Sequence, residues 1–344
     1  MPIGGKLVEL EAGINRVECK KCGCVKQEKI EFAAPKCQHT RFFERYALEL
    51  LRHMTIKDVA AHLGVSWDVI KDMDKRYLKK KFGRPRLKDT RLIAIDEISV
   101  GSGHKYFTVV LDLAKGACLF VGEGKGEDAL KPFWKKLKVS GAKIAAVAMD
   151  MSPAFIAAVV KNLPGAKIVF DHFHVVKMLN DKLSDLRREL HSNAKDKLHK
   201  NVLKGTRWLL LKNPENLNDK RDERKHLDEA LAINQPLAAA YYLKEDLRRL
   251  WKQLCKSDAN KFLSEWIARA EVSGISIMVK FARTLAAHRS GIIAYYDYPI
   301  STGPLEGVNN KIKTMKRQAY GFRDKEFFML KILGLHESKY ALVG

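Results

Sequence analysis

The chain has 344 residues and a formal net charge of +23, from 63 Lys and Arg against 40 Asp and Glu. Hydrophobic residues make up 46% of it, which excludes a disordered chain. The sequence holds neither an apolar run long enough to cross a bilayer nor the apolar core of a signal peptide. We therefore expect a cytoplasmic protein without membrane contacts, whose positive charge favours a nucleic-acid partner over solvated surface charges.

The N-terminal region is rich in cysteine. Four of the six cysteines stand before residue 40, at positions Cys19, Cys22, Cys24 and Cys37. Without a secretion signal, such a cluster favours metal binding over disulfides. Cys19 and Cys22 form a C-x-x-C pair, which is half of a four-ligand zinc site. We therefore expect residues 1–40 to form a partial zinc-finger-like segment.

The next region, residues 41–78, has a helical pattern. An apolar stripe that includes Val59 and Leu63 stops at Gly64, and Ser66 is suited to cap a second helix. A helix, a glycine-containing turn and a second helix are typical of a helix-turn-helix, whose second helix reads bases in the major groove. An ordinary helical hairpin is the alternative.

Residues 79–90 are expected to form a basic linker. Pro85 disfavours helix and keeps the GRPR core extended. An extended basic segment can follow DNA and contact its phosphates, whereas the alternative is a solvated linker. The residues expected to bind DNA here are Lys79, Lys80, Lys81, Arg84 and Arg86.

Strand patterns begin at residue 91. Three strand-like runs, and then strands alternating with helices, predict an α/β mixed sheet flanked by helices over residues 91–176. The pattern is helical over 177–300, which indicates an α-helical insertion. A further helix follows Gly303 and Pro304, within residues 301–344.

Two aspartates stand on apolar strands. Asp96 lies within RLIAIDEISV, and Asp150 ends KIAAVAMD. Burying an unpaired carboxylate is costly, and a divalent cation between two neighbouring carboxylates removes their repulsion. Oxygen ligands suit Mg²⁺ or Mn²⁺. Glu97 is a poor substitute for Asp96 because strand alternation sends it to the opposite face. A cap or a turn is the alternative role for either aspartate taken singly.

Four segments in this order resemble bacterial insertion-sequence transposases of the ISL3 family: DEISVGSGHKYFTVVLDL, AMDMSPAF, DHFHVVKMLN and ISTGPLEGVNNKIKTMKRQAYGF. These are DDE transposases. The resemblance implies an RNase H-like sheet with a long α-helical insertion, preceded by a zinc finger and a helix-turn-helix. It also implies that Asp96, Asp150 and Glu306 are the catalytic acids and metal ligands.

The resemblance implies an activity and partners. The activity is DNA cleavage at transposon ends and strand transfer into target DNA, with two divalent metal ions. The partners are terminal inverted repeats, target DNA and further copies of the chain, on the bacterial nucleoid. One alternative is a catalytically silent or truncated DNA-binding regulator derived from a transposase. A second is a structure-specific nuclease without strand transfer.

The family's zinc finger resembles one with an earlier cysteine pair, upstream of the PIGG stretch. Here that stretch begins at Pro2. Either the pair lies outside this chain, or Cys24, Cys37 and His39 supply the remaining Zn²⁺ ligands.

The DHFH motif places Asp171 and His174 at a strand–helix junction. The pair resembles a D-x-x-H signature of related transposases, and we expect an accessory role in orienting a metal-bound carboxylate or a phosphate. A helix cap and a core histidine are the alternative.

The helix after Pro304 carries Glu306, Asn310, Lys313 and Arg317 at spacings that place them on one face. We expect Glu306 to face the metals, while Lys313 and Arg317 hold DNA phosphates and Asn310 is accessory. A solvated basic face is the alternative.

The helical insertion is expected to contact DNA or a second protomer through its basic residues. Trp208 in this span is interpreted as a core residue, in preference to a stacking platform for an unpaired base.

Overall fold

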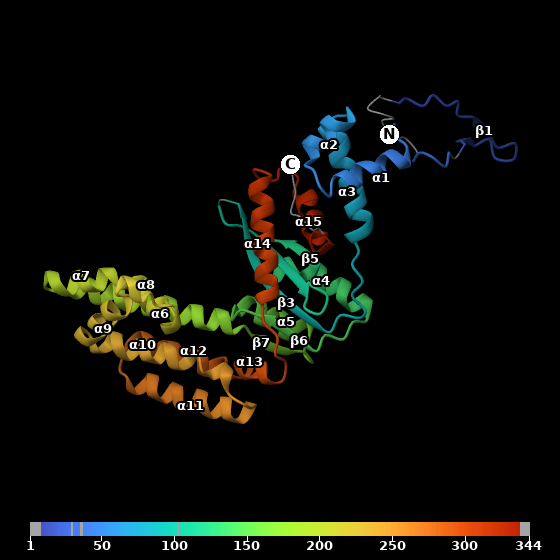
Figure 1. Ribbon diagram of the computed structural model, residues 1–344. Helices are drawn as coiled ribbons and strands as arrows, with labels where there is room; N and C mark the ends of the chain where they lie inside the picture. Colours follow the sequence, from blue (N-terminus) through green and yellow to red (C-terminus); the bar gives the residue numbers. More distant parts are fainter. Residues whose placement is uncertain (1–7, 29, 35–36, 102, 338–344) are drawn as a thin grey trace. The chain divides into compact units, whose positions relative to one another are not determined.

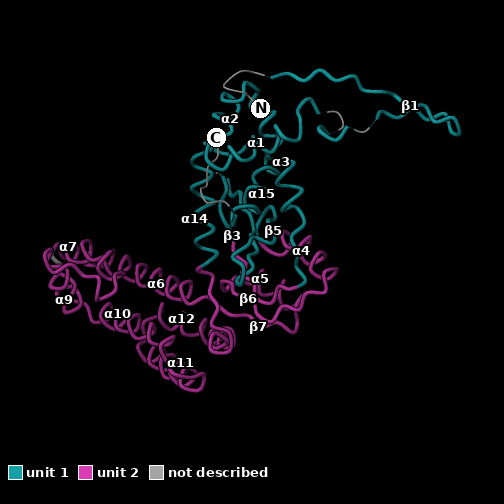
Figure 2. Tube along the Cα trace, turned by 45° about the vertical axis from the view of Figure 1, so that its right-hand side comes forward, with its two compact units in different colours: residues 1–88, 97–125, 304–344 teal, residues 89–96, 126–303 magenta. Residues whose placement is uncertain are grey.

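The computed structural model describes residues 8–28, 30–34, 37–101 and 103–337 (Figure 1). The chain divides into two compact units (Figure 2). The first unit comprises residues 1–88, 97–125 and 304–344, and the second comprises residues 89–96 and 126–303. Every helix within the described ranges is too short or too polar to span a bilayer.

The first unit contains the helix-turn-helix. Its helices are α1 (Arg41–Leu50), α2 (Ile56–Leu63) and α3 (Trp67–Phe82). Thr55 caps α2 by accepting the N–H of Asp58 at 3.1 Å. Gly64 ends α2 in the left-handed conformation at φ 67°, which costs glycine little. Ser66 occupies the N-cap of α3 as expected, but its side chain makes no cap hydrogen bond.

A helix from the far end of the chain completes the core of the helix-turn-helix. Phe327 and Leu330 of α15 (Lys325–Leu333) are buried with Ile70 and Met73 of α3 in one apolar cluster. Such burial of apolar surface is the main stabilising contribution to a core. The helix-turn-helix is therefore built into the first unit together with α15.

The end of α3 corrects one expectation. The helical region was expected to stop at residue 78, but α3 continues to Phe82, whose ring lies edge-on to that of His336 at 5.5 Å. Lys79, Lys80 and Lys81 therefore lie in the last turn of a helix, and the prediction that they belong to an extended linker is wrong. Packing of Phe82 against the C-terminal segment favours the extra turn over the extended backbone near Pro85.

Five strands form one mixed sheet in the order β5-β4-β3-β6-β7. Their bounds are β3 (Leu92–Gly101), β4 (Lys105–Asp112), β5 (Ala117–Glu123), β6 (Ala146–Met149) and β7 (Lys167–Phe170). Strands β4 and β5 are antiparallel, whereas β6 is parallel to both β3 and β7. This is the α/β fold with a mixed sheet that the strand patterns predict.

Helices connect the parallel strands of the second unit, as a parallel pair requires. Helix α4 (Glu127–Ser140) precedes β6, and α5 (Pro153–Asn162) leads from β6 to β7. All four residues of β6 are buried. A strand buried on both faces reads as a continuous apolar run, which is the pattern of KIAAVAMD.

The rest of the second unit is helical. Its α-helices are α6 (His172–Asn193), α7 (Lys197–Gly205), α8 (Arg207–Leu211), α9 (Glu223–Ile233), α10 (Gln235–Leu247), α11 (Lys256–Val272), α12 (Ser276–Ala287) and α13 (Arg289–Ile293). No strand occurs in this span among the residues that the structure describes. Helix α10 packs against α6, α9 and α11 (Figure 1).

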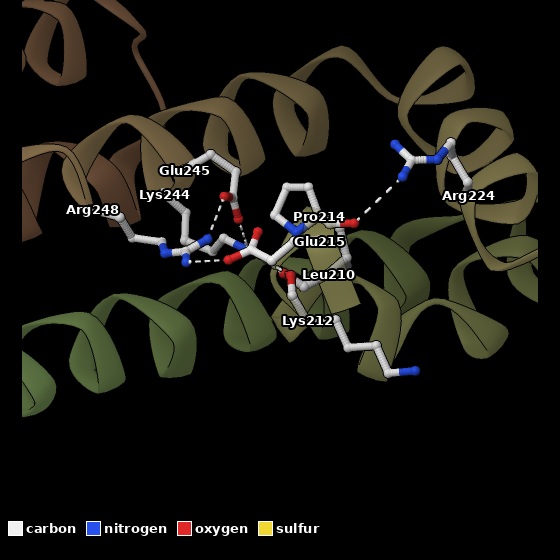
Figure 3. Close-up of polar contacts among 8 residues, drawn as sticks. All are labelled: Leu210, Lys212, Pro214, Glu215, Arg224, Lys244, Glu245 and Arg248. Atoms are coloured by element: carbon white, nitrogen blue, oxygen red, sulfur yellow. Dashed lines mark hydrogen bonds and ion pairs between the residues drawn. The ribbon is translucent and has the colours of Figure 1, made fainter. Parts of the chain in front are cut away.

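A buried lysine ties α10 to the C-terminal end of α8 (Figure 3). Lys244 is 1% exposed and donates to the carbonyl of Leu210 at 2.9 Å and to that of Lys212 at 3.3 Å. Burial lowers the pKa of Lys244 against the opposing effect of Glu245. Arg248 bridges Glu245 at 2.8 Å and Glu215 at 3.1 Å. These bonds satisfy buried polar groups where the helical span turns back on itself.

Candidate active site

The parallel strands of the second unit bring carboxylates to one level of the sheet. Ala94 of β3 lies opposite Ala148 of β6, and each stands two residues before an aspartate, Asp96 or Asp150. Two residues along a strand return to the same face, and neighbouring strands lie about 4.8 Å apart. Asp96 and Asp150 thus each follow, by two residues, a pair of directly opposed residues on adjacent parallel strands.

Both aspartates are half-buried. An oxygen of Asp150 accepts the N–H of Ser152 at 3.0 Å, a turn that leads into α5. This bond holds the carboxylate at the strand end while leaving capacity for further donors or a cation.

A third carboxylate follows β7. Met149 lies opposite Phe170, and Asp171 comes next, with its N–H bonded to the Met149 carbonyl at 3.1 Å. Asp150 and Asp171 thus directly follow β6 and β7, Asp96 lies within β3 two residues after Ala94, and together the three are called the carboxylate edge. Asp171 is the most enclosed of the three, at 2% exposure.

The surroundings of Asp171 include a contact that sequence patterns did not indicate. Thr302 donates its hydroxyl to Oδ2 of Asp171 at 2.6 Å, across 131 residues of sequence. His172 Nδ1 lies 3.4 Å from Oδ1, and His174 Nε2 lies 4.0 Å from Oδ2. Among the described residues, Oδ1 has no hydrogen-bond partner.

The alternative interpretation of the DHFH motif, a helix cap with a core histidine, agrees with the structure only in part. Asp171 occupies the N-cap of α6 but makes no side-chain cap bond, and His174 is half-buried, so neither a simple cap nor a core histidine describes the pair. The motif is a buried carboxylate held by a threonine hydroxyl beside two imidazoles.

Glu306 belongs to the first unit. It lies in the first turn of α14 (Gly303–Gln318) and is exposed. The N-terminal end of a helix dipole favours a negative side chain there. Asn310, Lys313 and Arg317 are also exposed, as their shared face requires. The opposite side of α14 is buried through Leu305, Asn309, Ile312 and Met315.

The basic residues expected to bind DNA fall into two groups. Lys79 is paired with Glu326 at 2.8 Å, and Lys81 is paired with Glu337. Lys80, Arg84 and Arg86 are exposed and form no ion pair with another described residue. The second group is therefore better placed to meet phosphates.

The cysteine segment forms a small hairpin. Strands β1 (Arg16–Glu18) and β2 (Val25–Gln27) are antiparallel, and Cys19, Cys22 and Cys24 are exposed in or beside the turn that joins them. Hydrogen bonds from Lys21 and Cys22 lower the pKa of the Cys19 thiol.

This hairpin carries the C-x-x-C pair, Cys19 and Cys22, that was expected to bind zinc. Within the described part of the chain, no three His, Cys, Asp or Glu side chains are grouped closely enough to hold a metal ion. His39, one of the residues considered as a further ligand, stacks on Phe43 at 5.0 Å. A four-ligand zinc site is not assembled by Cys24, Cys37 and His39.

The interpretation of Trp208 as a core residue is wrong. Its side chain is 65% exposed in the short helix α8, and the Arg207 guanidinium lies 4.7 Å from its ring centroid. The buried face of α8 is formed by Leu209 and Leu210, which leaves Trp208 outside.

Comparisons with known families decide the assignment. A model of ISL3-type DDE transposases, described as "Transposase", matches residues 93–332. A second model, the helix-turn-helix domain of transposase family ISL3, matches residues 28–78. The chain belongs to the ISL3 family of transposases. The helix-turn-helix match begins within the region expected to be zinc-finger-like and ends at residue 78, inside α3.

Curated relatives agree with this assignment over most of the chain. The transposase for insertion sequence element IS1001 of Bordetella parapertussis is 34% identical over 335 residues, covering 96% of this transposase and 82% of the relative. The transposase for insertion sequence element IS1557 of Mycobacterium tuberculosis is 28% identical over 343 residues, covering 93% and 76%.

Proposed function

We propose that this transposase cleaves DNA at the terminal inverted repeats of an insertion sequence and joins the freed ends to target DNA. Asp96, Asp150 and Glu306 hold the Mg²⁺ or Mn²⁺ ions for both reactions. The observation that carries the proposal is the parallel pairing of β3 with β6, in which Ala94 lies opposite Ala148 and an aspartate follows two residues after each. The ISL3 family match supports Glu306 as the third acid.

The donor set suits such ions. Carboxylate oxygens are the ligands that Mg²⁺ and Mn²⁺ prefer, and two like charges on neighbouring strands repel each other without a cation. Asp150 and Asp171 form no ion pair with a lysine or arginine among the described residues. When bound, two divalent ions supply positive charge to the attacking and leaving oxygens of a phosphodiester.

The chain's own groups position these acids and the DNA. The Ser152 N–H fixes the Asp150 carboxylate, and the Thr302 hydroxyl fixes Asp171. Asp171 and His174 act as accessory residues that orient the neighbouring acids. Asn310, Lys313 and Arg317 follow the DNA backbone from the exposed face of α14, where Arg317 can grip one phosphate through two hydrogen bonds.

We propose a domain organisation to match. Residues 91–176 and 301–344 form an RNase H-like catalytic domain, and residues 177–300 form a helical insertion that contacts DNA or a second protomer. The helix-turn-helix of 41–78 recognises the transposon ends within a homo-oligomer on DNA at the nucleoid. Zn²⁺ binding through Cys19 and Cys22 needs ligands beyond this pair.

A strand-transfer assay with the full chain tests the proposal. With Mg²⁺, the wild type should cut a duplex that carries the terminal repeats and join the ends to plasmid DNA. Asp96→Asn and Asp150→Asn should each lower both products at least about 100-fold, because Asn keeps the shape but loses the charge.

The matched control is Glu97→Gln, which removes one carboxylate from the opposite face of the same strand. It should retain activity, and all variants should still bind the end duplex in a gel-shift assay. Near wild-type cleavage by Asp150→Asn would contradict the catalytic assignment. Cleavage by the wild type without joining would favour a nuclease over a transposase mechanism.

A further inference from the structure

A cavity of about 700 Å³ opens in the first unit, between the start of α3 and the turn that joins α14 to α15. No residue of the carboxylate edge belongs to it. Its lining includes Trp67, Lys71, Tyr320, Phe322, Arg323 and Phe327. This volume is in the range of sites that take a small ligand or a single group of a larger one.

Tyr320 is held outward by an uncommon backbone. Its φ is 50°, and it is followed by Gly321 at φ 100°. A non-glycine residue in the left-handed region is rare, and for a bulky side chain it indicates strain that often accompanies a functional site. The turn is fixed by bonds from Tyr320 N–H to Arg317 O at 3.1 Å and from Gly321 N–H to Lys316 O at 3.0 Å. The side chain is 101% exposed, so this strain is not offset by burial of the ring.

A second aromatic ring, that of Trp67, also lines the cavity. Trp67 is the first residue of α3 and is 42% exposed. Phe322 lines the cavity as well, where it stacks on Phe328 at 4.3 Å and adds apolar surface. Two outer aromatic faces and an apolar wall form a surface on which a flat, unsaturated ring can stack.

Cationic groups stand at the same cavity. The Lys71 ammonium lies 5.7 Å from the Trp67 ring centroid and 3.1 Å from Asp324. Arg323 is exposed and forms no ion pair among the described residues. A flat ring that carries a phosphate would therefore meet aromatic faces and a guanidinium together.

We propose that this cavity receives one unstacked base of the DNA that the helix-turn-helix binds. DNA is the occupant that fits best, because the cavity begins at the first residue of the second helix of that domain, and its rim adds positive charge in a strongly basic chain. A base pulled from the stack finds aromatic partners in Trp67 and Tyr320, and its phosphate finds Arg323. The inference rests on DNA binding by this unit and not on the metal chemistry.

The test compares two short duplexes of the same sequence, one fully paired and one with a single unpaired 2-aminopurine. The wild type should bind the unpaired duplex about 5- to 100-fold more tightly, and stacking should change the fluorescence of 2-aminopurine on binding. Trp67→Ala and Tyr320→Ala should each remove most of this preference, whereas Tyr320→Phe should keep it.

Three further variants serve as controls, for folding, for the position of the stacking residue and for the catalytic site. Tyr320→Gly relieves the backbone strain, so it should melt no lower than the wild type while losing the preference. Trp208→Ala removes another exposed tryptophan, outside the cavity, and should leave the preference unchanged. Asp150→Asn should also keep it, which distinguishes this proposal from the catalytic one.

Equal binding of the two duplexes by the wild type would overturn the proposal. An unchanged preference in both Trp67→Ala and Tyr320→Ala would do the same. Loss of the preference in Trp208→Ala alone would assign the stacking site to the helical insertion instead.

Discussion

The carboxylate edge and the contact between α3 and α15 are both clusters of charge, but they are neutralised differently. The α3–α15 cluster consists of Lys71, Lys75, Lys79, Asp324 and Glu326, and it alternates cations with anions at 2.8–3.1 Å. The carboxylate edge gathers anions on neighbouring strands. The first cluster contains its own counter-charges and serves as a structural clamp, whereas for the second we propose a divalent cation as the counter-charge.

The pKa of Asp324 illustrates the difference. Burial acts to raise it, but the Phe327 N–H and the ammonium groups of Lys75 and Lys71 outweigh burial and hold the pKa at about 2. Hydrogen bonds to Glu326 and Asp324 in turn raise the pKa of Lys75. Each charge in this cluster is stabilised by a protein partner.

Among the residues that support the proposed catalytic acids, the largest effect is expected at Asp171, which accepts a hydrogen bond from the Thr302 hydroxyl. Asp171→Asn should lower cleavage about 10- to 100-fold, because loss of the buried charge changes the support of the neighbouring acids. Thr302→Val removes the 2.6 Å hydrogen bond while keeping the side chain's shape, and it should cause a smaller loss in the same direction. Wild-type cleavage rates in both variants would show that Asp171 has no part in positioning.

The basic face of α14 should matter next. Lys313→Ala and Arg317→Ala should each lower strand transfer and end binding together, by about tenfold, because each removes a charged hydrogen bond to phosphate. Lys311→Ala is the matched control, since it is also exposed but lies about 140° around the helix from Glu306. Equal losses of strand transfer in all three variants would contradict specific phosphate contacts by Lys313 and Arg317, and would indicate that α14 attracts DNA only through its overall charge.

The α3–α15 cluster should respond through stability. Asp324→Asn keeps the cap on α15 but removes the charge, and it should lower the free energy of unfolding by about 2 kcal/mol, as the pKa shift implies. Asp324→Ala also loses the cap and should cost about 1 kcal/mol more. Chemical denaturation measures both. If Asp324→Asn were as stable as the wild type at neutral pH, the claim that the Asp324 charge stabilises the α3–α15 contact would be wrong.

The pH dependence follows from the sign of the same shift. Because the folded pKa of Asp324 lies below its ordinary value of 3.8, its stabilisation is complete above about pH 4 and is lost as pH falls through about 2. In Asp324→Asn this part of the acid dependence should be absent. A melting-temperature series from pH 2 to pH 5 would show it.

The smallest expected effect is on the salt dependence of DNA binding, and it compares basic residues that form ion pairs within the protein with those that do not. Lys80→Ala, Arg84→Ala and Arg86→Ala should each reduce the slope of log affinity against log salt by about one, because each releases a phosphate contact. Lys79→Ala and Lys81→Ala should change it less, since those ammonium groups face Glu326 and Glu337. An equal change of slope in all five variants would show that the Lys79–Glu326 and Lys81–Glu337 ion pairs open when the protein binds DNA.

The features that could be predicted from the sequence are those that depend on residues close together in the chain. The apolar runs around Asp96 and Asp150 predicted the strands that became β3 and β6, because strand periodicity is set within a few residues. The turn at Gly64 and the exposed face of α14 were predicted for the same reason.

Features that depend on distant partners were not reached. The Asp171–Thr302 bond joins residues 131 positions apart, and the extra turn of α3 depends on packing with the C-terminal segment. Lys244 is buried where the carbonyls of Leu210 and Lys212 accept its hydrogen bonds. A lysine in a helical sequence pattern is normally exposed, so the pattern does not predict this burial. Trp208 is exposed because its neighbours fill the core first.

Binding of Mn²⁺ to the full chain, followed by electron paramagnetic resonance, tests the central claim most directly. The wild type and Glu97→Gln should bind Mn²⁺ with similar affinity, whereas Asp96→Asn and Asp150→Asn should each bind at least about tenfold more weakly, because one negative oxygen ligand is lost. Mn²⁺ affinity in Asp150→Asn equal to that of the wild type would contradict the claim that the strand-end carboxylates hold the metal.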